Sequence, residues 1–466
     1  MNTNGIINIK IILIFKKGLY PMKINFGRMM LQIAKKYENK PALINIEKNR
    51  KYTFMEFHLL TNKICNMMHH RFQMKENDFF ALMLQNDNMS LFNVWTAKGL
   101  PAGVWLNYRD AIDEHLYQID FLEPRLLFIE KEKLELYYEK MNERGITMIC
   151  MDEVPEKFEG VHYFWDLIEE ASDQETNVEY DIDKHTIISK FTGGTTGRGK
   201  CVRFSVRTIL STAYYLFAHS ENLMDETTKF LHVTPFSHAT EAFWFPSFIK
   251  GGVNYTLNTS DLELFCEVTE REKITATFLV PTLLYRLLDI NSEDKYDLSS
   301  LNLVIYGASP MSPRKLQELQ STFGNIFCQI YGATEAYPPV IFLGFEDHVV
   351  TDDKNVIASA GRALPGVEII IADVEGNEVP TGEEGELWIR GDAVIKGYYK
   401  QPEKTEESFT ANGFWKSGDI GYMDKDGYVY IIDRKKDMII SGGFNVYASE
   451  VKHALNSHPA VQQSVV

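Results

Sequence analysis

The sequence is poor in cysteine and has no apolar segment long enough to cross a bilayer. Its five cysteines are far apart and show no CxxC or Cys/His pairing, which argues against a disulfide framework and a structural zinc site. The apolar run at 6–15 is too short to span a membrane, and it lacks the features that flank the apolar core of a signal peptide. We therefore expect a cytoplasmic protein without stable membrane insertion, with an extension of doubtful structure at 1–21.

Positive charge is also in short supply. The chain carries 48 Lys and Arg against 64 Asp and Glu, so its formal net charge is −16. Most of such a surface repels a phosphate backbone, which makes nucleic acid an unsuitable partner. At 466 residues and 45% hydrophobic, the chain is too long for one ordinary core, and two or more packed units are expected.

Short β-branched runs alternate with amphipathic helical stretches, which predicts an α/β protein with buried sheets. Several of the predicted strands run directly into Gly, Pro or Thr, and ligands in open α/β sheets lie at such strand ends. The strands predicted to be buried are 186–191, 277–280, 303–306 and 327–331. Beyond about residue 361 the pattern changes to short strands at 367–372, 385–390 and 427–433, separated by Glu-Gly, Thr-Gly and Asp-Gly turns, which predicts a smaller β subdomain.

The sharpest local signal is the segment FTGGTTGRGK at 191–200, which follows a predicted strand. Glycines let backbone N–H groups turn towards phosphate oxygens, threonine hydroxyls add donors, and Lys200 adds positive charge. The alternative is a flexible surface turn. The spacing also fits the GxxxxGK pattern of nucleoside triphosphatases, but Cys201 stands where a hydroxyl should hold magnesium, and a strand is predicted where a helix should begin.

Eight segments follow one another along the chain: FTGGTTGRGK, TPFSHATEAFW, YGASPMSP, YGATEA, GRALPGVEI, GELWIRGDAVIKGYYKQPEKT, FWKSGDIGYMDKDGYVYIIDRKKDMIISGGFNVYASEVK and HPAV. Their order and spacing resemble those of the adenylate-forming superfamily of acyl-CoA synthetases, luciferases and peptide-synthetase adenylation domains. The resemblance covers the chain from about Met22 to its end.

The resemblance implies a large AMP-binding domain at 22–433, made of two α/β sheet subdomains and the β-rich part from about 361. An incomplete, mobile α+β domain would follow at 434–466. The implied reaction uses ATP, Mg²⁺ and CoA: a carboxylate attacks the α-phosphate to give acyl-AMP, and the CoA thiol then takes the acyl group. A fatty or aryl acid is favoured over an amino acid, and a homodimer or a carrier-protein partner stays open.

The resemblance also implies residue roles at the nucleotide site. The 191–200 loop would hold the β- and γ-phosphates, although the commoner pattern has Ser, Pro and Gly at positions 193, 199 and 201. Glu335 and Thr195 would hold Mg²⁺, Tyr331 would pack on adenine, and Asp419 would accept hydrogen bonds from the ribose. The full set of nucleotide contacts would be Thr192, Gly193, Gly194, Thr195, Thr196, Gly197, Lys200, Gly307, Ala308, Ser309, Tyr331, Gly332, Thr334, Asp419 and Arg434.

Three further roles follow from the same resemblance. His238 would act as a gate between the nucleotide and acyl or thiol sites, its alternative being a packing residue. Lys436 would be the hinge of the small domain, its alternative being a solvated charge, and Gly442 and Gly443 would approach CoA. Thr195, Lys200, His238, Glu335 and Lys436 are the expected catalytic residues.

The family's lysine near the C-terminus finds no counterpart here, because no lysine follows Lys452. We therefore expect this chain to be a truncated ligase with impaired adenylation. Two alternatives remain: a catalytically weak protein that binds nucleotide or acyl-adenylate, and a ligase that transfers its acyl group to a carrier-protein thiol.

Overall fold

The computed structural model describes residues 22–93, 98–99, 101–193, 198–218, 223–293, 295–348, 356–437, 439–441, 444–446, 448, 451, 455 and 464. The expected extension at 1–21 and most of 434–466 therefore lie outside the described residues. Within the described part, no helix has the length and apolar character needed to cross a membrane.

The first large sheet has seven strands in the order β11-β10-β5-β4-β6-β7-β8. All neighbours are parallel except β10 and β11. Alternate residues of β4 face opposite sides: Phe80 and Leu82 join the core between the two large sheets, whereas Phe79, Ala81 and Met83 join an outer core. The strands are β4 (Phe79–Met83), β5 (Ala102–Trp105), β6 (Leu126–Ile129), β7 (Thr147–Cys150), β8 (His162–Tyr163), β10 (Thr186–Phe191) and β11 (Cys201–Ser205).

The second large sheet has nine strands in the order β18-β17-β16-β15-β14-β12-β13-β2-β3. Its six central strands are parallel, and antiparallel strands close both edges. The strands are β2 (Pro41–Asn45), β3 (Arg50–Thr53), β12 (Lys229–His232), β13 (Val253–Thr256), β14 (Ala276–Leu279), β15 (Leu303–Gly307), β16 (Phe327–Tyr331), β17 (Ile341–Leu343) and β18 (Arg362–Ala363).

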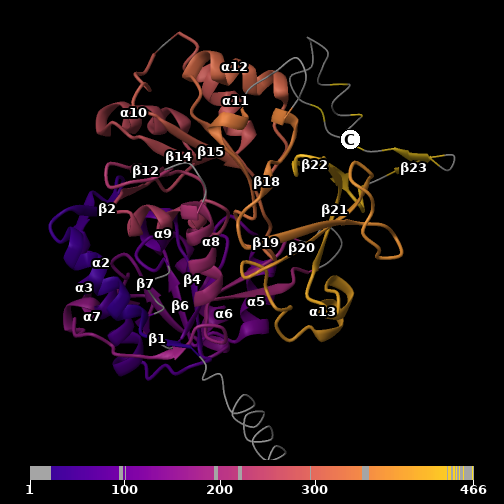
Figure 1. Cartoon of the computed structure of the whole chain (residues 1–466). Coiled ribbons are helices and arrows are strands. Elements are labelled where there is room, and N and C mark those ends of the chain that lie inside the picture. The colour runs from indigo at the N-terminus through magenta and orange to yellow at the C-terminus, as the bar shows by residue number, and fades with distance from the viewer. Residues whose placement is uncertain are drawn as a thin grey trace, which may run out of the picture.

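Helices form layers on and between these sheets (Figure 1). The core between the sheets takes residues from α2 (Phe26–Tyr37), α3 (Phe54–Asn66), α7 (Phe164–Glu170), α8 (Val206–Ala218) and α9 (Glu241–Ile249). The outer core of the seven-stranded sheet takes residues from α5 (Ile112–Leu122) and α6 (Lys131–Glu143). The outer core of the nine-stranded sheet takes residues from α10 (Leu262–Glu272), α11 (Pro281–Ile290) and α12 (Pro313–Phe323).

A third, antiparallel sheet has the order β19-β20-β21-β22 and lies beside α13 (Figure 1). Its elements are β19 (Val367–Ala372), β20 (Gly385–Gly391), β21 (Trp415–Met423), β22 (Val429–Arg434) and α13 (Pro402–Ser408). The smaller elements are β1 (Lys23–Ile24), α4 (Asn86–Met89), β9 (Tyr180–Asp181), β23 (Ile439–Ser441), β24 (Phe444–Val446) and the short helical turns η1 (Met67–Arg71), η3 (Phe345–Asp347) and η4 (Val356–Ala358). The predicted fold, two α/β sheet units with a smaller β unit, is confirmed.

Candidate functional site

A cleft of about 1630 Å³ opens where strands of both large sheets end. Its walls come from the segments that follow β5, β10, β12, β14, β15 and β16, so it occupies the position at which open α/β sheets bind ligands. The predicted site residues that line it are Thr192, Gly193, His238, Ala308, Gly332 and Thr334.

The 191–200 loop joins two antiparallel strands, β10 and β11. Thr192 N donates to the Lys200 carbonyl at 2.9 Å, and Lys200 N donates to Thr192 Oγ1 at 3.2 Å, so the base of the loop is closed. Gly199 is required at this base, because a Cβ there would lie 2.5 Å from the Thr192 carbonyl oxygen. The predicted phosphate contacts Gly194, Thr195, Thr196 and Gly197 lie outside the described residues. The strand predicted after the loop is confirmed as β11.

Three side chains meet beside this loop. Lys200 Nζ donates to Tyr398 Oη at 2.8 Å, and Tyr398 Oη donates to Glu335 Oε1 at 2.7 Å. Lys200 Nζ also lies 3.8 Å from Glu335 Oε1. Burial lowers the pKa of Lys200, Glu335 opposes that shift, and the nearby charges of Lys404 and Lys436 lower it further. Burial and the Glu335 carboxylate raise the pKa of Tyr398, which keeps its hydroxyl protonated and able to donate.

The chain brings Glu335 to this point through its backbone. Ala336 forms an isolated bridge with Val394, and Ile395 N donates to the Glu335 carbonyl at 2.9 Å. These contacts join the segment after β16 to the segment that leads to Tyr398. Sequence reasoning placed Glu335 and Lys200 at the site but missed Tyr398. Tyr398 lies in the GYYKQPEKT segment, where no adjacent residue marks it as functional.

A second cluster joins β16 to the third sheet. Tyr331 Oη donates to Asp419 Oδ2, and Arg434 Nε lies 2.6 Å from Asp419 Oδ1. Asp419 and Arg434 are opposite each other in the β21–β22 ladder. Burial raises the pKa of Asp419, whereas Arg434 and Tyr331 act to lower it. The structure therefore brings the predicted Tyr331 together with the predicted Asp419 and Arg434.

The turn after β15 is tightly constrained. A Cβ on Gly307 would lie 2.4 Å from the Ile330 carbonyl oxygen, so β15 and β16 can approach each other only with glycine there. Ala308 adopts a positive φ of 66° and lines the cleft. Ser309 follows it as an exposed residue that is absent from the cleft lining. Gly332 and Thr334 follow the neighbouring strand β16 and also line the cleft.

His238 lies in the cleft wall after β12, where its Nδ1 is 3.0 Å from Ser237 Oγ. The ring is exposed within the cleft, yet the surrounding walls and the positive charge of Lys190 lower its pKa. A neutral imidazole at this position can exchange hydrogen bonds with a ligand. Lys436 is an exposed residue just beyond β22, whereas Gly442 and Gly443 lie outside the described residues.

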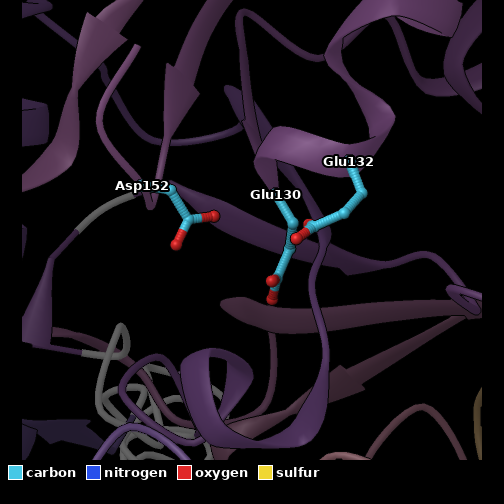
Figure 2. A group of neighbouring side chains, drawn as sticks. All are labelled: Glu130, Glu132 and Asp152. Carbon is cyan, nitrogen blue, oxygen red and sulfur yellow. The ribbon is translucent and has the colours of Figure 1, made fainter.

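A group of carboxylates lies on the seven-stranded sheet, made of Glu130, Glu132 and Asp152 (Figure 2). Two of these carboxylates already accept hydrogen bonds from donors within the protein. Glu130 Oε1 accepts from Gln85 N and Asn88 Nδ2, each at 2.9 Å, and Asp152 accepts from Lys48 Nζ and Lys131 N, each at 3.2 Å. Burial raises the pKa of Glu130 to about 7. Glu130 and Asp152 are therefore already engaged by hydrogen bonds within the protein.

A family model for AMP-binding enzymes matches residues 31–399. The chain belongs to the AMP-binding enzyme family. Among curated relatives, it is 36% identical over 348 residues to the medium/long-chain-fatty-acid–CoA ligase FadD8 of Mycobacterium tuberculosis, a match that covers 74% of this chain and 59% of that protein. The chain thus spans less than two thirds of the length of that AMP-binding relative.

Two further AMP-binding relatives match along almost the whole chain. The 2-succinylbenzoate–CoA ligase of Bacillus velezensis is 29% identical over 440 residues, covering 94% of this chain and 84% of that protein. The structure of O-succinylbenzoate coenzyme A synthetase from Bacillus subtilis in complex with AMP has a TM-score of 0.80 and 26% identity, covering 95% of this chain and 85% of that one. These matches confirm the resemblance to adenylate-forming enzymes.

Proposed function

We propose that this protein activates a carboxylic acid with ATP, forming an acyl adenylate and pyrophosphate, and then transfers the acyl group to the CoA thiol. Membership of the AMP-binding family supports this proposal, as do the names of its relatives, which are ligases that join acids to CoA. The acid is proposed to be a fatty or an aryl acid, since those two classes are named for the two curated relatives above.

The observation that carries the proposal is the meeting of Lys200, Tyr398 and Glu335 at the base of the 191–200 loop. Phosphoryl chemistry of this kind depends on positioning and on charge placed where the transition state needs it. Lys200 brings a positive charge to the loop that would hold the phosphates, and Tyr398 fixes its direction. Thr192 and Gly193 add a hydroxyl and a backbone N–H along the same edge of the cleft.

Glu335 fits the proposed role as the holder of Mg²⁺. Its side chain is 11% exposed and its Oε1 accepts the bond from Tyr398, while no hydrogen bond from the described part of the chain reaches Oε2. A carboxylate oxygen is a suitable ligand for a hard divalent cation. When bound there, the ion would supply neutralising charge to the phosphates.

Asp419 is proposed to bind the ribose hydroxyls of the nucleotide. An ionised carboxylate has several acceptor positions, so it can serve a ribose while Arg434 and Tyr331 hold it in place. Tyr331, at the end of β16, would then support adenine. His238, with its neutral imidazole, would separate the nucleotide from the acyl part of the cleft. A domain boundary near 434, with Lys436 as its hinge, belongs to the same proposal.

The test is ATP–pyrophosphate exchange by the purified chain with fatty, aryl and amino acids. We expect exchange that requires a fatty or aryl acid and that falls by at least about tenfold in Glu335→Gln, because that variant lacks the charge that would hold the metal. Glu368→Gln, which removes an exposed carboxylate paired with Arg390 on the third sheet, is the matched control. Hydrolysis of ATP that needs no acid would overturn the proposal.

A further inference from the structure

The cleft has a charged residue in its wall that the proposed reaction does not use. Lys190 lies on β10 and lines the cleft, yet it is only 7% exposed. It forms an ion pair with Glu241, the first residue of α9, which is 1% exposed. The Lys190 Nζ atom also lies 6.0 Å from the centre of the Tyr337 ring.

As a purely structural feature, the Lys190–Glu241 ion pair would carry a high desolvation cost. Removing two charges from water costs several kcal/mol per ion, and replacing such a pair by apolar residues is often neutral or stabilising. Here the pair is also incomplete, because Glu241 Oε1 is buried and has no hydrogen-bond partner among the described residues. Stabilisation of the fold therefore gives a poor account of these two charges.

The position of Lys190 connects it to the reacting end of the cleft. Lys190 is the last residue but one of β10, and Thr192 follows the strand, so their Cα atoms are about 7 Å apart; both residues line the cleft. Thr192 begins the loop proposed to hold the phosphates. Phe204, Ala242 and Tyr337 also line the cleft, as does His238, which is near enough for the positive charge of Lys190 to lower its pKa.

The chemistry of the pair limits what it can recognise. A lysine ammonium has three N–H donors, and Glu241 takes one of them through Oε2. The remaining donors suit a carbonyl or hydroxyl oxygen. Because Glu241 already neutralises the charge of Lys190, a second carboxylate on the substrate would place two anions against one cation and would be disfavoured.

We propose that Lys190, positioned by Glu241, determines the specificity of the acyl pocket and selects acids that carry a carbonyl or hydroxyl oxygen along the chain over plain alkyl acids. This inference rests on the proposed function. It deepens that function by naming the substrate class: monocarboxylic acids whose chain carries an uncharged carbonyl or hydroxyl group. Lys190 donates a hydrogen bond to the carbonyl or hydroxyl oxygen on the chain of the substrate, and Glu241 acts by positioning Lys190.

The test compares decanoic acid, a series of oxodecanoic acids with the carbonyl at successive positions, and decanedioic acid. For each acid, kcat/KM is measured in ATP–pyrophosphate exchange, and binding is measured by calorimetry, which does not require turnover. We expect one oxo acid to exceed decanoic acid by about 10- to 100-fold, the effect of one hydrogen bond to a charged group in a desolvated site. Decanedioic acid should have the lowest kcat/KM and the weakest binding of all these acids.

The variants separate a role in specificity from a role in folding. The double variant K190M/E241Q removes both charges with little change in volume, and it should abolish the preference for the oxo acid. K190R keeps the donors and should retain the preference, and Lys184→Met, at an exposed lysine paired with Asp181, is the control. Exchange with all monocarboxylic acids but no preference in the native chain would overturn this inference and leave the proposed function intact. No exchange and no acid binding with any acid would overturn both.

Discussion

Tyr398→Phe is the change that probes the site most selectively. It removes one hydroxyl, which accepts a bond from Lys200 and donates one to Glu335, and it leaves the aromatic ring in place. The ring packs against Phe409 at 5.9 Å between centroids, and that contact is retained by phenylalanine. The variant therefore tests the positioning of two charged groups without creating a cavity.

The expected size of the effect follows from these contacts. Each hydrogen bond to a charged group contributes about 1.5–3 kcal/mol. Lys200 is 32% exposed on its side chain and lies 3.8 Å from Glu335, so water and the direct ion pair recover part of the loss. We expect a net loss of about 1–2 kcal/mol, which corresponds to a fall of about 5- to 30-fold in kcat/KM for ATP.

The assay is ATP–pyrophosphate exchange with ATP and the acid varied in turn. The effect should appear in the ATP dependence, because Lys200 and Glu335 stand at the proposed phosphate and metal positions. Tyr138→Phe is the matched control, since its hydroxyl donates to the Glu159 carbonyl at an exposed site away from the cleft. Exchange by Tyr398→Phe that equals the native rate, or a loss confined to the acid dependence, would refute the reasoning.

Three further outcomes are expected. Asp419→Asn should raise the KM for ATP at least about tenfold with little change for the acid, because an amide replaces the carboxylate held by Arg434; an equal change for both substrates would contradict this. Gly199→Ala should lower exchange about 10- to 100-fold, since its Cβ would lie 2.5 Å from the Thr192 carbonyl oxygen; native-like exchange would contradict it. Burial lowers the pKa of His232 to about 3, below its unfolded value near 6.5. As pH falls, His232 is therefore protonated first in the unfolded chain, and the free energy of unfolding should decrease from about pH 6.5 towards pH 3. Urea midpoints between pH 7.5 and 5 should show this fall, and His232→Asn should reduce its slope by up to about 1.4 kcal/mol per pH unit.

Strand prediction succeeded where apolar runs ended abruptly. Residues 186–191, 327–331 and 367–372 are strands β10, β16 and β19 with the predicted bounds. In each case a β-branched or aromatic run meets Gly, Thr or Asp, and the strand ends there because the following residues favour a turn. Strand ends were predicted less accurately where the boundary residue suits both a strand and the start of a helix. The strand predicted at 277–280 is Ala276–Leu279, because Val280 is the N-cap residue of α11.

Site residues were predictable where the sequence carries a local motif. The glycine-rich loop and the YGATEA segment identify Lys200 and Glu335, and the structure places them 3.8 Å apart. Tyr398 and Lys190 could not be found this way, because their importance comes from partners far along the chain. Tyr398 and its partner Glu335 are 63 positions apart in the sequence, and Lys190 and its partner Glu241 are 51 positions apart. Such pairings depend on how the sheets assemble, which one segment does not reveal.

The central claim is that an acid is activated through its adenylate. The most direct measurement supplies the acid with its carboxylate labelled with ¹⁸O, together with ATP, Mg²⁺ and CoA, and determines by mass spectrometry which product carries the label. If a carboxylate oxygen attacks the α-phosphate and releases pyrophosphate, and the thiol then attacks the acyl carbon and displaces AMP, one labelled oxygen must appear in AMP. We predict labelled AMP and unlabelled pyrophosphate. Label in inorganic phosphate, with ADP as the nucleotide product, would contradict the account.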